Sequence, residues 1–258
     1  MGAANDKVRS ERTGDTVTIT LCNPAKRNSL GLDVLRALID AFDDAAESDA
    51  TGIVLAAEGP VFSAGHNFGE MQGATFEDAN ELFTVCSSLM QMMHTVPQPV
   101  VAKVHALATA AGCQLVASAD LAVAARSASF AIPGGKGGLF CHTPLVAVAR
   151  NVGRKQALEF AMSGDAITAE KALQWGLVNE VVDDADLDSA VAALLARVTR
   201  GSAWSKALGK RTFWEQVNMT EADAYEFASA VMADAVTGDS AQEGIAAFLE
   251  KREPRFPR

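Results

Sequence analysis

Two loops in this sequence consist mainly of small residues, which let a backbone approach a ligand closely. The first, residues 62–67 (Phe-Ser-Ala-Gly-His-Asn), follows the apolar run 52–57. The second, residues 106–115 (Ala-Leu-Ala-Thr-Ala-Ala-Gly-Cys-Gln-Leu), follows the apolar run 99–104. Such loops leave backbone N–H groups open, because no large side chain covers them. Two of them can aim one N–H each at a single oxygen, which is the arrangement of an oxyanion hole.

The elements that must position these loops alternate between strands and helices. Alternating or continuous apolar runs predict strands at residues 16–21, 53–57, 100–104 and 120–125. Apolar residues at helical spacing predict helices at residues 33–47, 77–93, 112–118, 144–151, 154–163, 169–175 and 187–200. This alternation is typical of an α/β fold with helices outside layered sheets.

The end of the chain follows a different pattern. Beyond about residue 201 the sequence predicts helices only, at residues 205–216, 221–235 and 241–251. We therefore expect a core over residues 1–200, which holds the two loops, and a helical region over residues 201–258.

Composition excludes several classes of protein. Hydrophobic residues make up 49% of the 258 residues and charged residues 21%, as in soluble globular proteins. A net charge of −10 argues against a nucleic-acid surface, which needs clustered Lys and Arg. The four Cys and four His are scattered without metal-ligand spacing, so we expect no metal site. No apolar signal segment or membrane span is evident, which predicts a cytosolic protein without a membrane partner.

The two loops and two later segments, residues 167–179 and 243–252, resemble the crotonase family of enoyl-CoA hydratases and isomerases. The residues that match the family pattern are Phe62, Ala64, Gly65, Asn67, Ala108, Ala111, Gly112, Gln114, Leu115 and Asp120. The resemblance implies the crotonase (ClpP-like) α/β fold, a spiral of ββα units. It also implies that the C-terminal helices form trimer contacts, in a homotrimer or in a homohexamer built as a dimer of trimers.

The resemblance assigns roles to particular residues. The backbone N–H groups of His66 and Ala111 would form the oxyanion hole for a thioester enolate. The substrate would be an acyl- or enoyl-CoA ester, with no permanently bound cofactor. The residues implied to contact the CoA ester are Lys26, Arg27, Ala64, Gly65, His66, Asn67, Phe68, Ala111, Gly112, Pro133, Leu139, Phe248 and Lys251.

The sequence departs from the family at both catalytic acids. Hydratases of the family use two glutamates around a water, and the matching positions hold Gln114 and Gly134. Glutamine cannot exchange a proton near neutral pH, and glycine has no side chain. The His66 imidazole and His142 remain as candidate acid/base groups, since histidine titrates near working pH. Cys141 is a weaker candidate nucleophile, because nothing in the sequence indicates a lowered thiol pKa.

Two functions fit these features. The first is an acyl-CoA-processing enzyme of the hydratase/isomerase type, a lyase in fatty acid metabolism, with hydration, isomerisation, hydrolysis and decarboxylation all open. A related decarboxylase of malonyl-type thioesters carries the same Ser-Ala-Gly-His pattern as residues 63–66. The second is a catalytically silent acyl-CoA-binding protein that kept the fold and lost the acids.

Overall fold

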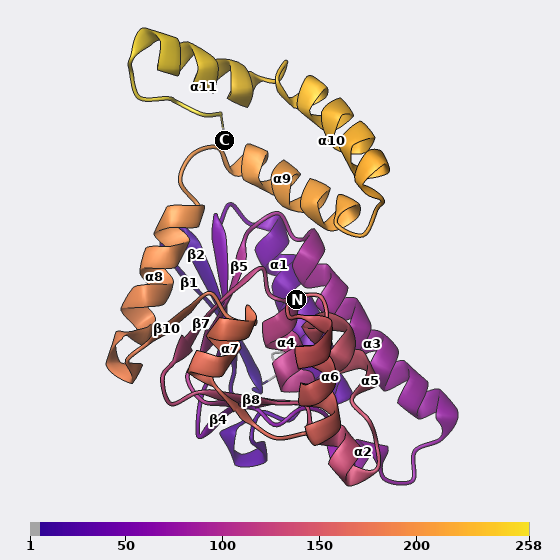
Figure 1. Cartoon of the computed structure of the whole chain (residues 1–258). Helices are drawn as coiled ribbons and strands as arrows, with labels where there is room; N and C mark the ends of the chain where they lie inside the picture. The colour runs from indigo at the N-terminus through magenta and orange to yellow at the C-terminus, as the bar shows by residue number, and fades with distance from the viewer. Residues whose placement is uncertain (1–5, 258) are drawn as a thin grey trace.

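The computed structural model describes residues 6–257 and contains two β-sheets with helices packed around them (Figure 1). The larger sheet has six strands in the order β1-β2-β3-β5-β7-β10. All neighbouring strands in it are parallel except β1 and β2, which pair antiparallel. The bounds are β1 (Val8–Thr13), β2 (Thr16–Leu21), β3 (Gly52–Ala57), β5 (Val100–Val104), β7 (Leu121–Ala125) and β10 (Glu180–Val182).

The central strands of this sheet are buried on both faces, which explains why they read as continuous apolar runs. On one face, Ile53 and Leu55 of β3 join the main core with α1 (Leu32–Glu47) and α3 (Phe76–Thr95). On the other face, Val54 and Ala56 pack in a second cluster with α8 (Leu187–Val198). Figure 1 shows α8 on one side of the sheet and α1 and α3 on the other.

A second, smaller sheet lies across one end of the first. Its order is β4-β6-β8-β9, and β4, β6 and β8 run parallel, while β9 is antiparallel to β8. The bounds are β4 (Val61–Ser63), β6 (Leu107–Thr109), β8 (Ser129–Ala131) and β9 (Ile167–Thr168). Because β4, β6 and β8 are parallel, the loops that follow them leave from the same edge.

Five further helices connect and cover these sheets. They are α2 (Phe68–Met71), α4 (Ala111–Ser118), α5 (His142–Val148), α6 (Arg154–Ser163) and α7 (Ala169–Trp175). Every residue of α4 is buried, and this helix follows directly from the loop after β6. No helix of the described part is long and apolar enough to cross a membrane.

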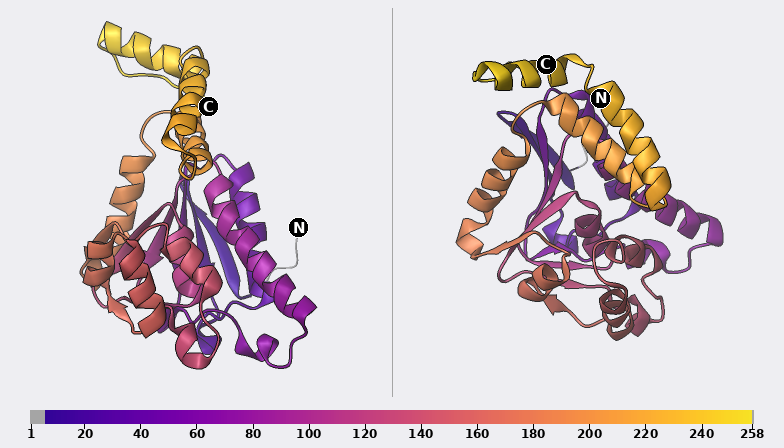
Figure 2. Two further views of the ribbon diagram at one scale, coloured as in Figure 1. Left: turned by 45° about the vertical axis from the view of Figure 1, so that its right-hand side comes forward. Right: turned by 45° about the horizontal axis from the view of Figure 1, so that its top comes forward.

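The chain ends in three helices, α9 (Ala203–Gln216), α10 (Glu221–Ala235) and α11 (Asp239–Glu250). Figures 1 and 2 show α10 and α11 standing away from the sheets, with α9 between them and the core. No residue of α9 or α10 is buried in this single chain. Their exposed large apolar side chains include Trp204, Phe213, Tyr225 and Met232.

One buried ion pair joins α9 to the larger sheet. Lys210 Nζ lies 2.6 Å from a carboxylate oxygen of Asp120, the residue before β7, and both side chains are largely buried. The same carboxylate accepts hydrogen bonds from the Val100 backbone N–H at 2.8 Å and from Trp214 Nε1 at 3.2 Å. Asp120 therefore fixes α9 to the beginnings of β5 and β7.

Candidate active site

The ends of β4 and β6 bring the two small-residue loops into backbone contact. After β4 the chain turns at Gly65, whose φ is 83°. A Cβ added there would lie 2.8 Å from the Ala110 Cβ and 3.1 Å from the Ala111 nitrogen. A Cβ on Gly112 would lie 2.5 Å from the Ser63 carbonyl oxygen. Glycine is therefore required at both positions by the close approach of the two loops.

Two backbone N–H groups at this contact have no protein acceptor. Within residues 6–257, neither the His66 nor the Ala111 N–H donates a hydrogen bond to another protein group. Ala111 is the first residue of α4, so the positive end of the helix dipole lies at its N–H. The sequence prediction that these loops expose one N–H each is consistent with this geometry.

Ala110, in the second loop, adopts a conformation that usually requires glycine. Its φ is 50° and its ψ is −119°. Its N–H donates to the Ala131 carbonyl at 2.8 Å, and its carbonyl accepts the Gln114 N–H at 3.0 Å. These two bonds hold the residue in place and orient the Ala111 N–H that follows. Sequence reasoning missed this residue, because an alanine gives no sign of a positive φ.

The His66 side chain is fixed in one tautomer. Its Nδ1 lies 3.2 Å from the Leu30 carbonyl oxygen, which can only accept, so Nδ1 carries the proton. Its Nε2 is buried and has no partner among the described residues. The Phe83 ring meets the imidazole edge-on with 5.2 Å between centroids. Burial lowers the pKa of His66, which favours the neutral ring.

Gln114 lies on the first turn of α4, on the same helix face as Ala111. Its side chain is only 3% exposed, and its Oε1 has no hydrogen-bond partner within the described part of the chain. Buried amide oxygens normally accept a hydrogen bond, since an unpaired one costs about 1–3 kcal/mol. The position predicted from the family therefore holds a buried acceptor that cannot carry a negative charge.

Gly134, at the second family-acid position, begins the loop after β8. A Cβ there would lie 2.1 Å from the Leu139 carbonyl oxygen and 2.7 Å from the Cys141 Sγ. The Gly134 N–H donates to that sulfur at 3.2 Å, and its carbonyl accepts the Leu139 N–H at 3.0 Å. The loop closes so tightly around this residue that no side chain fits without a rearrangement. Restoring a glutamate here is therefore not a simple substitution.

The other candidate groups are placed less favourably. His142 is exposed at the start of α5, and the centroid of its ring lies 5.3 Å from that of the Phe140 ring. Cys141 is buried, and desolvation raises the pKa of its thiol, which disfavours a nucleophilic thiolate. Lys136, which lies in the Gly-rich loop with Gly134, forms an ion pair with Asp165. Among the described residues, no group of three or more His, Cys, Asp or Glu is arranged to hold a metal ion.

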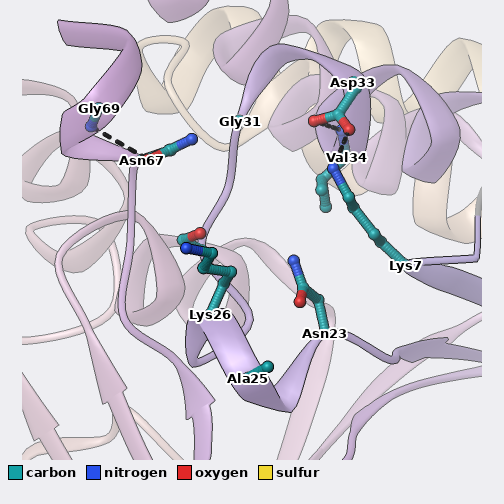
Figure 3. Close-up of a pocket in the computed structure, with 10 residues that line it drawn as sticks. Lys7, Asn23, Ala25, Lys26, Gly31, Asp33, Val34, Asn67 and Gly69 are labelled. Atoms are coloured by element: carbon teal, nitrogen blue, oxygen red, sulfur yellow. Dashed lines mark hydrogen bonds and ion pairs between the residues drawn. The ribbon is translucent and has the colours of Figure 1, made fainter.

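A cavity of about 550 Å³ opens beside the first loop (Figure 3). Its lining residues are Lys7, Asn23, Ala25, Lys26, Ser29, Gly31, Asp33, Val34, Asn67 and Gly69. Figure 3 shows Lys7 and Asp33 on one side of it and Asn67 and Gly69 on the other. Lys7 forms an ion pair with Asp33, so part of the positive charge is compensated. Lys7 was not among the residues predicted to contact CoA.

Hydrogen bonds join the segment before α1, which lines the cavity, to the loop that carries the His66 N–H. The Ala64 N–H donates to the Arg27 carbonyl at 2.9 Å, and the Leu30 N–H donates to the Gly65 carbonyl at 2.8 Å. Glu70 accepts the Leu32 N–H at 2.9 Å and the Asn67 side-chain amide at 2.8 Å. The loop that carries His66 is thereby held against the segment before α1. Glu70 was also missed, because its role depends on a contact between distant segments.

The predicted CoA-contact residues fall into three groups. Lys26 and Arg27 lie between β2 and α1, and Lys26 lines the cavity. Those on the loops after β4, β6 and β8 gather around the smaller sheet, where Phe68 and Leu139 are exposed. Phe248, which is 82% exposed, and Lys251 lie instead on or just after α11, at the opposite end of the molecule from α2 (Figure 1). The single chain does not bring these two residues to the site.

A model of one protein family, described as enoyl-CoA hydratase/isomerase, matches residues 11–258. The chain belongs to the enoyl-CoA hydratase/isomerase family. This confirms the resemblance inferred from the two loops, and with it the crotonase fold.

Individual members of the family are similar over nearly the whole chain. Enoyl-CoA hydratase domain-containing protein 3, mitochondrial, of Rattus norvegicus is 44% identical over 251 residues, which cover 96% of this chain and 84% of that protein. The crystal structure of an enoyl-CoA hydratase of Mycobacterium smegmatis superposes with a TM-score of 0.94 at 42% identity, covering 97% of this chain and 99% of that one. The human domain-containing protein 3 structure gives a TM-score of 0.93 at 42% identity, covering 97% and 100%.

The predicted cytosolic location is wrong by this comparison, because the rat relative and its human counterpart are both named as mitochondrial. The prediction rested on the absence of an apolar signal segment. Mitochondrial targeting segments are amphipathic and basic rather than apolar, so that absence carries no information about this compartment.

Proposed function

We propose that this member of the family binds an acyl- or enoyl-CoA thioester and stabilises its enolate with the backbone N–H groups of His66 and Ala111. The single observation that carries the proposal is the pair of unbonded N–H groups where the loops after β4 and β6 touch. A thioester oxygen gains negative charge when the α-carbon loses a proton or when a nucleophile adds to a conjugated double bond. Donors fixed at that oxygen stabilise the charge without reorganisation.

The cavity near Lys26 supports the CoA part of the proposal. Its volume of about 550 Å³ lies within the range of small-molecule sites. Lys26 offers a cation for a phosphate group, and Asn67, which also lines the cavity, directly follows His66. A CoA ester with its phosphates near Lys26 would lead its thioester along the first loop to the N–H pair.

The proposal is tested by removing one donor without changing a side-chain function. In Ala111→Pro the ring replaces the N–H at the first position of α4, where proline is tolerated. We expect kcat/KM on a panel of trans-2-enoyl-CoA esters to fall about 100-fold or more. The matched control is Ala111→Gly, which keeps the N–H and should retain activity within about threefold of wild type.

Calorimetric titration with CoA and thermal unfolding of both variants show whether the fold and the CoA site survive. Full activity in a folded Ala111→Pro variant would contradict the oxyanion assignment. CoA-ester binding by the wild-type protein without turnover of any thioester would remove the catalytic half of the proposal and leave the binding half.

We further propose that the protein assembles as a homotrimer or a dimer of trimers through its C-terminal helices. The exposed apolar side chains of α9 and α10 support this proposal, since a lone chain leaves them in water. The remote position of Phe248 and Lys251 is consistent with contacts to a neighbouring subunit's substrate.

A further inference from the structure

Two buried acceptor atoms near the proposed oxyanion hole have no donor in the protein. His66 Nε2 and Gln114 Oε1 are both buried and unpaired among residues 6–257. One belongs to the residue that presents the first N–H, and the other lies one turn along α4 from the second. Helical side chains tilt towards the N-terminus, so Gln114 leans towards the Ala111 N–H. The site thus combines two free donors with two free acceptors.

The tautomer of His66 decides what its free nitrogen can do. Because Nδ1–H donates to the Leu30 carbonyl, Nε2 carries a lone pair. A neutral imidazole can accept a hydrogen bond there and then take the proton. Gln114 Oε1 can accept a hydrogen bond but cannot take a proton near neutral pH.

We propose that His66 Nε2 and Gln114 Oε1 together hold the oxygen that is added to or lost from the substrate, and that Nε2 carries its proton. This proposal rests on the proposed function and specifies its reaction and substrate class. The oxygen is an attacking water in one direction and the hydroxyl group of a 3-hydroxyacyl thioester in the other. His66 is then the catalytic acid/base, and Gln114 is the residue that orients the oxygen.

The proposed hydration needs no reactant other than water and the enoyl thioester. In the hydration direction, a water O–H bond breaks as Nε2 takes the proton, and the water oxygen forms a bond to C3 of the enoyl group. The electron pair of the C2–C3 double bond moves to the thioester oxygen, where the two N–H groups stabilise the enolate. The enolate then takes a proton from Nε2 at C2, which regenerates neutral His66.

Other charged groups near His66 favour this chemistry over decarboxylation of a malonyl-type thioester. Among the described residues, the charged side chain that acts on the imidazole is Glu70, and it is negative. Leu30 contributes a carbonyl oxygen and Phe83 an uncharged ring. A substrate carboxylate beside two acceptors and Glu70 would be repelled. Each Glu70 oxygen already accepts one hydrogen bond, from the Leu32 N–H and from the Asn67 side-chain amide.

The test uses variants that keep both backbone donors. His66→Ala retains its N–H but loses Nε2, and Gln114→Leu loses the acceptor at similar size. We measure hydration of crotonyl-CoA and dehydration of 3-hydroxybutyryl-CoA by the full-length protein, with malonyl-CoA as a third substrate. We expect kcat to fall about 100-fold or more in His66→Ala and less in Gln114→Leu, with the Kd for CoA unchanged in both. Added imidazole should restore part of the His66→Ala activity.

A pH profile separates catalysis from a purely structural role. Burial lowers the pKa of His66 below the usual histidine value of about 6.5. The wild-type kcat/KM should therefore fall with one-proton dependence at a pH below that value, where protonation removes the Nε2 lone pair. That acidic limb should be absent in His66→Ala. Crotonyl-CoA hydration retained in folded His66→Ala, or malonyl-CoA decarboxylation as the only wild-type reaction, would overturn the proposal. In either case a loss of activity in Ala111→Pro would leave the proposed function standing.

Discussion

At the scale of single residues, the second small-residue loop, residues 106–115, contains a strained alanine. Ala110, at φ 50° and ψ −119°, occupies a backbone region that is essentially restricted to glycine. A non-glycine residue there costs about 1–3 kcal/mol, which the surrounding contacts must offset. The strained residue lies between β6 and the Ala111 N–H. Its unfavourable backbone conformation therefore lowers stability at the residue that sets the direction of the Ala111 N–H.

Replacing Ala110 by glycine should therefore stabilise the protein. Relief of the strain outweighs the added freedom of the unfolded chain, which costs about 0.4–1 kcal/mol, so we expect a net gain of about 1 kcal/mol. Urea unfolding of Ala110→Gly measures the gain. Ala117→Gly, inside α4, is the matched control and should lose about 1 kcal/mol. Equal losses in both variants would show that Ala110 is not strained.

At Gly134, in contrast to Ala110, we expect a substitution to destabilise the protein. Since its Cβ would lie 2.1 Å from the Leu139 carbonyl oxygen, Gly134→Ala should cost about 2 kcal/mol through displacement of the loop. Gly137→Ala, three residues along in the same loop, meets nothing within 4 Å and should be close to neutral. Thermal unfolding of the two variants compares them directly. If Gly134→Ala were as stable as Gly137→Ala, the steric reason for the missing acid would be wrong.

At the scale of secondary-structure elements, the smaller sheet positions the site. Val61 pairs with Leu107 and Ser63 with Ala108, so the ends of β4 and β6 lie side by side. Ala108 and Thr109 pair in turn with Phe130 and Ala131 of β8. The three loops that hold His66, Ala111 and Gly134 therefore start from adjacent parallel strands.

The sequence predicted the helices well and this sheet not at all. Helices such as residues 154–163 were predicted at their observed bounds, because several turns of apolar spacing define a face. The predicted helix at 144–151 instead begins at His142 and ends at Val148. The strands β4, β6 and β8 have only three residues each, too few to show an alternation. β1 was missed because its exposed, polar residues show no buried face.

The candidate site was predictable where it depends on local sequence. The loops around His66 and Ala111 were recognised from small residues after apolar runs. The unpaired state of Gln114 Oε1 and the closed loop at Gly134 depend on contacts between distant segments. The same holds for the Asp120–Lys210 pair, whose partners lie 90 positions apart in the sequence by their residue numbers. No local pattern encodes such contacts.

That ion pair should control how firmly α9 is attached to the core. Burial lowers the pKa of Lys210, while Asp120 acts in the opposite direction. Lys210→Met leaves the largely buried Asp120 carboxylate without a counter-charge, and we expect a loss of about 3 kcal/mol. Adding Asp120→Asn should recover part of the loss, because the buried charge is then removed.

A double-mutant cycle by urea unfolding, followed by tryptophan fluorescence, measures this coupling. Lys206→Met, one turn earlier on α9, is the control and should change the free energy of unfolding by less than about 0.5 kcal/mol. Additive losses at Asp120 and Lys210 would mean that the pair does not anchor the helix.

At the scale of the whole molecule, the C-terminal helices leave an apolar surface uncovered. Tyr225 and Met232, two turns apart on α10, are 68% and 69% exposed. The anchored α9 holds α10 and α11 away from the sheets, as Figure 1 and the left view of Figure 2 show. A surface of this kind is unfavourable in a lone chain, which is why we place the subunit contacts here.

The proposed assembly predicts a particle of three or six times the chain mass of 27.0 kDa. Light scattering of the purified protein measures this mass. The double variant Tyr225→Glu/Met232→Glu places two charges on the apolar surface and should shift the mass towards a single chain. Asp234→Lys, elsewhere on α10, is the control and should keep the wild-type mass. A monomeric wild-type protein would contradict the assembly.

The His66 and Ala111 N–H groups, on the loops that touch at the ends of β4 and β6, belong to the main chain, and this has a consequence for divergence within the family. A mutation at position 66 or 111, other than to proline, leaves its N–H in place. Under the proposed function, lineages could therefore exchange the side chains around the thioester, as Gln114 and Gly134 illustrate, while each descendant would keep the proposed stabilisation of the enolate. The proposed shared part of the chemistry would then be encoded by the path of the backbone, and the side chains around it would set the reaction.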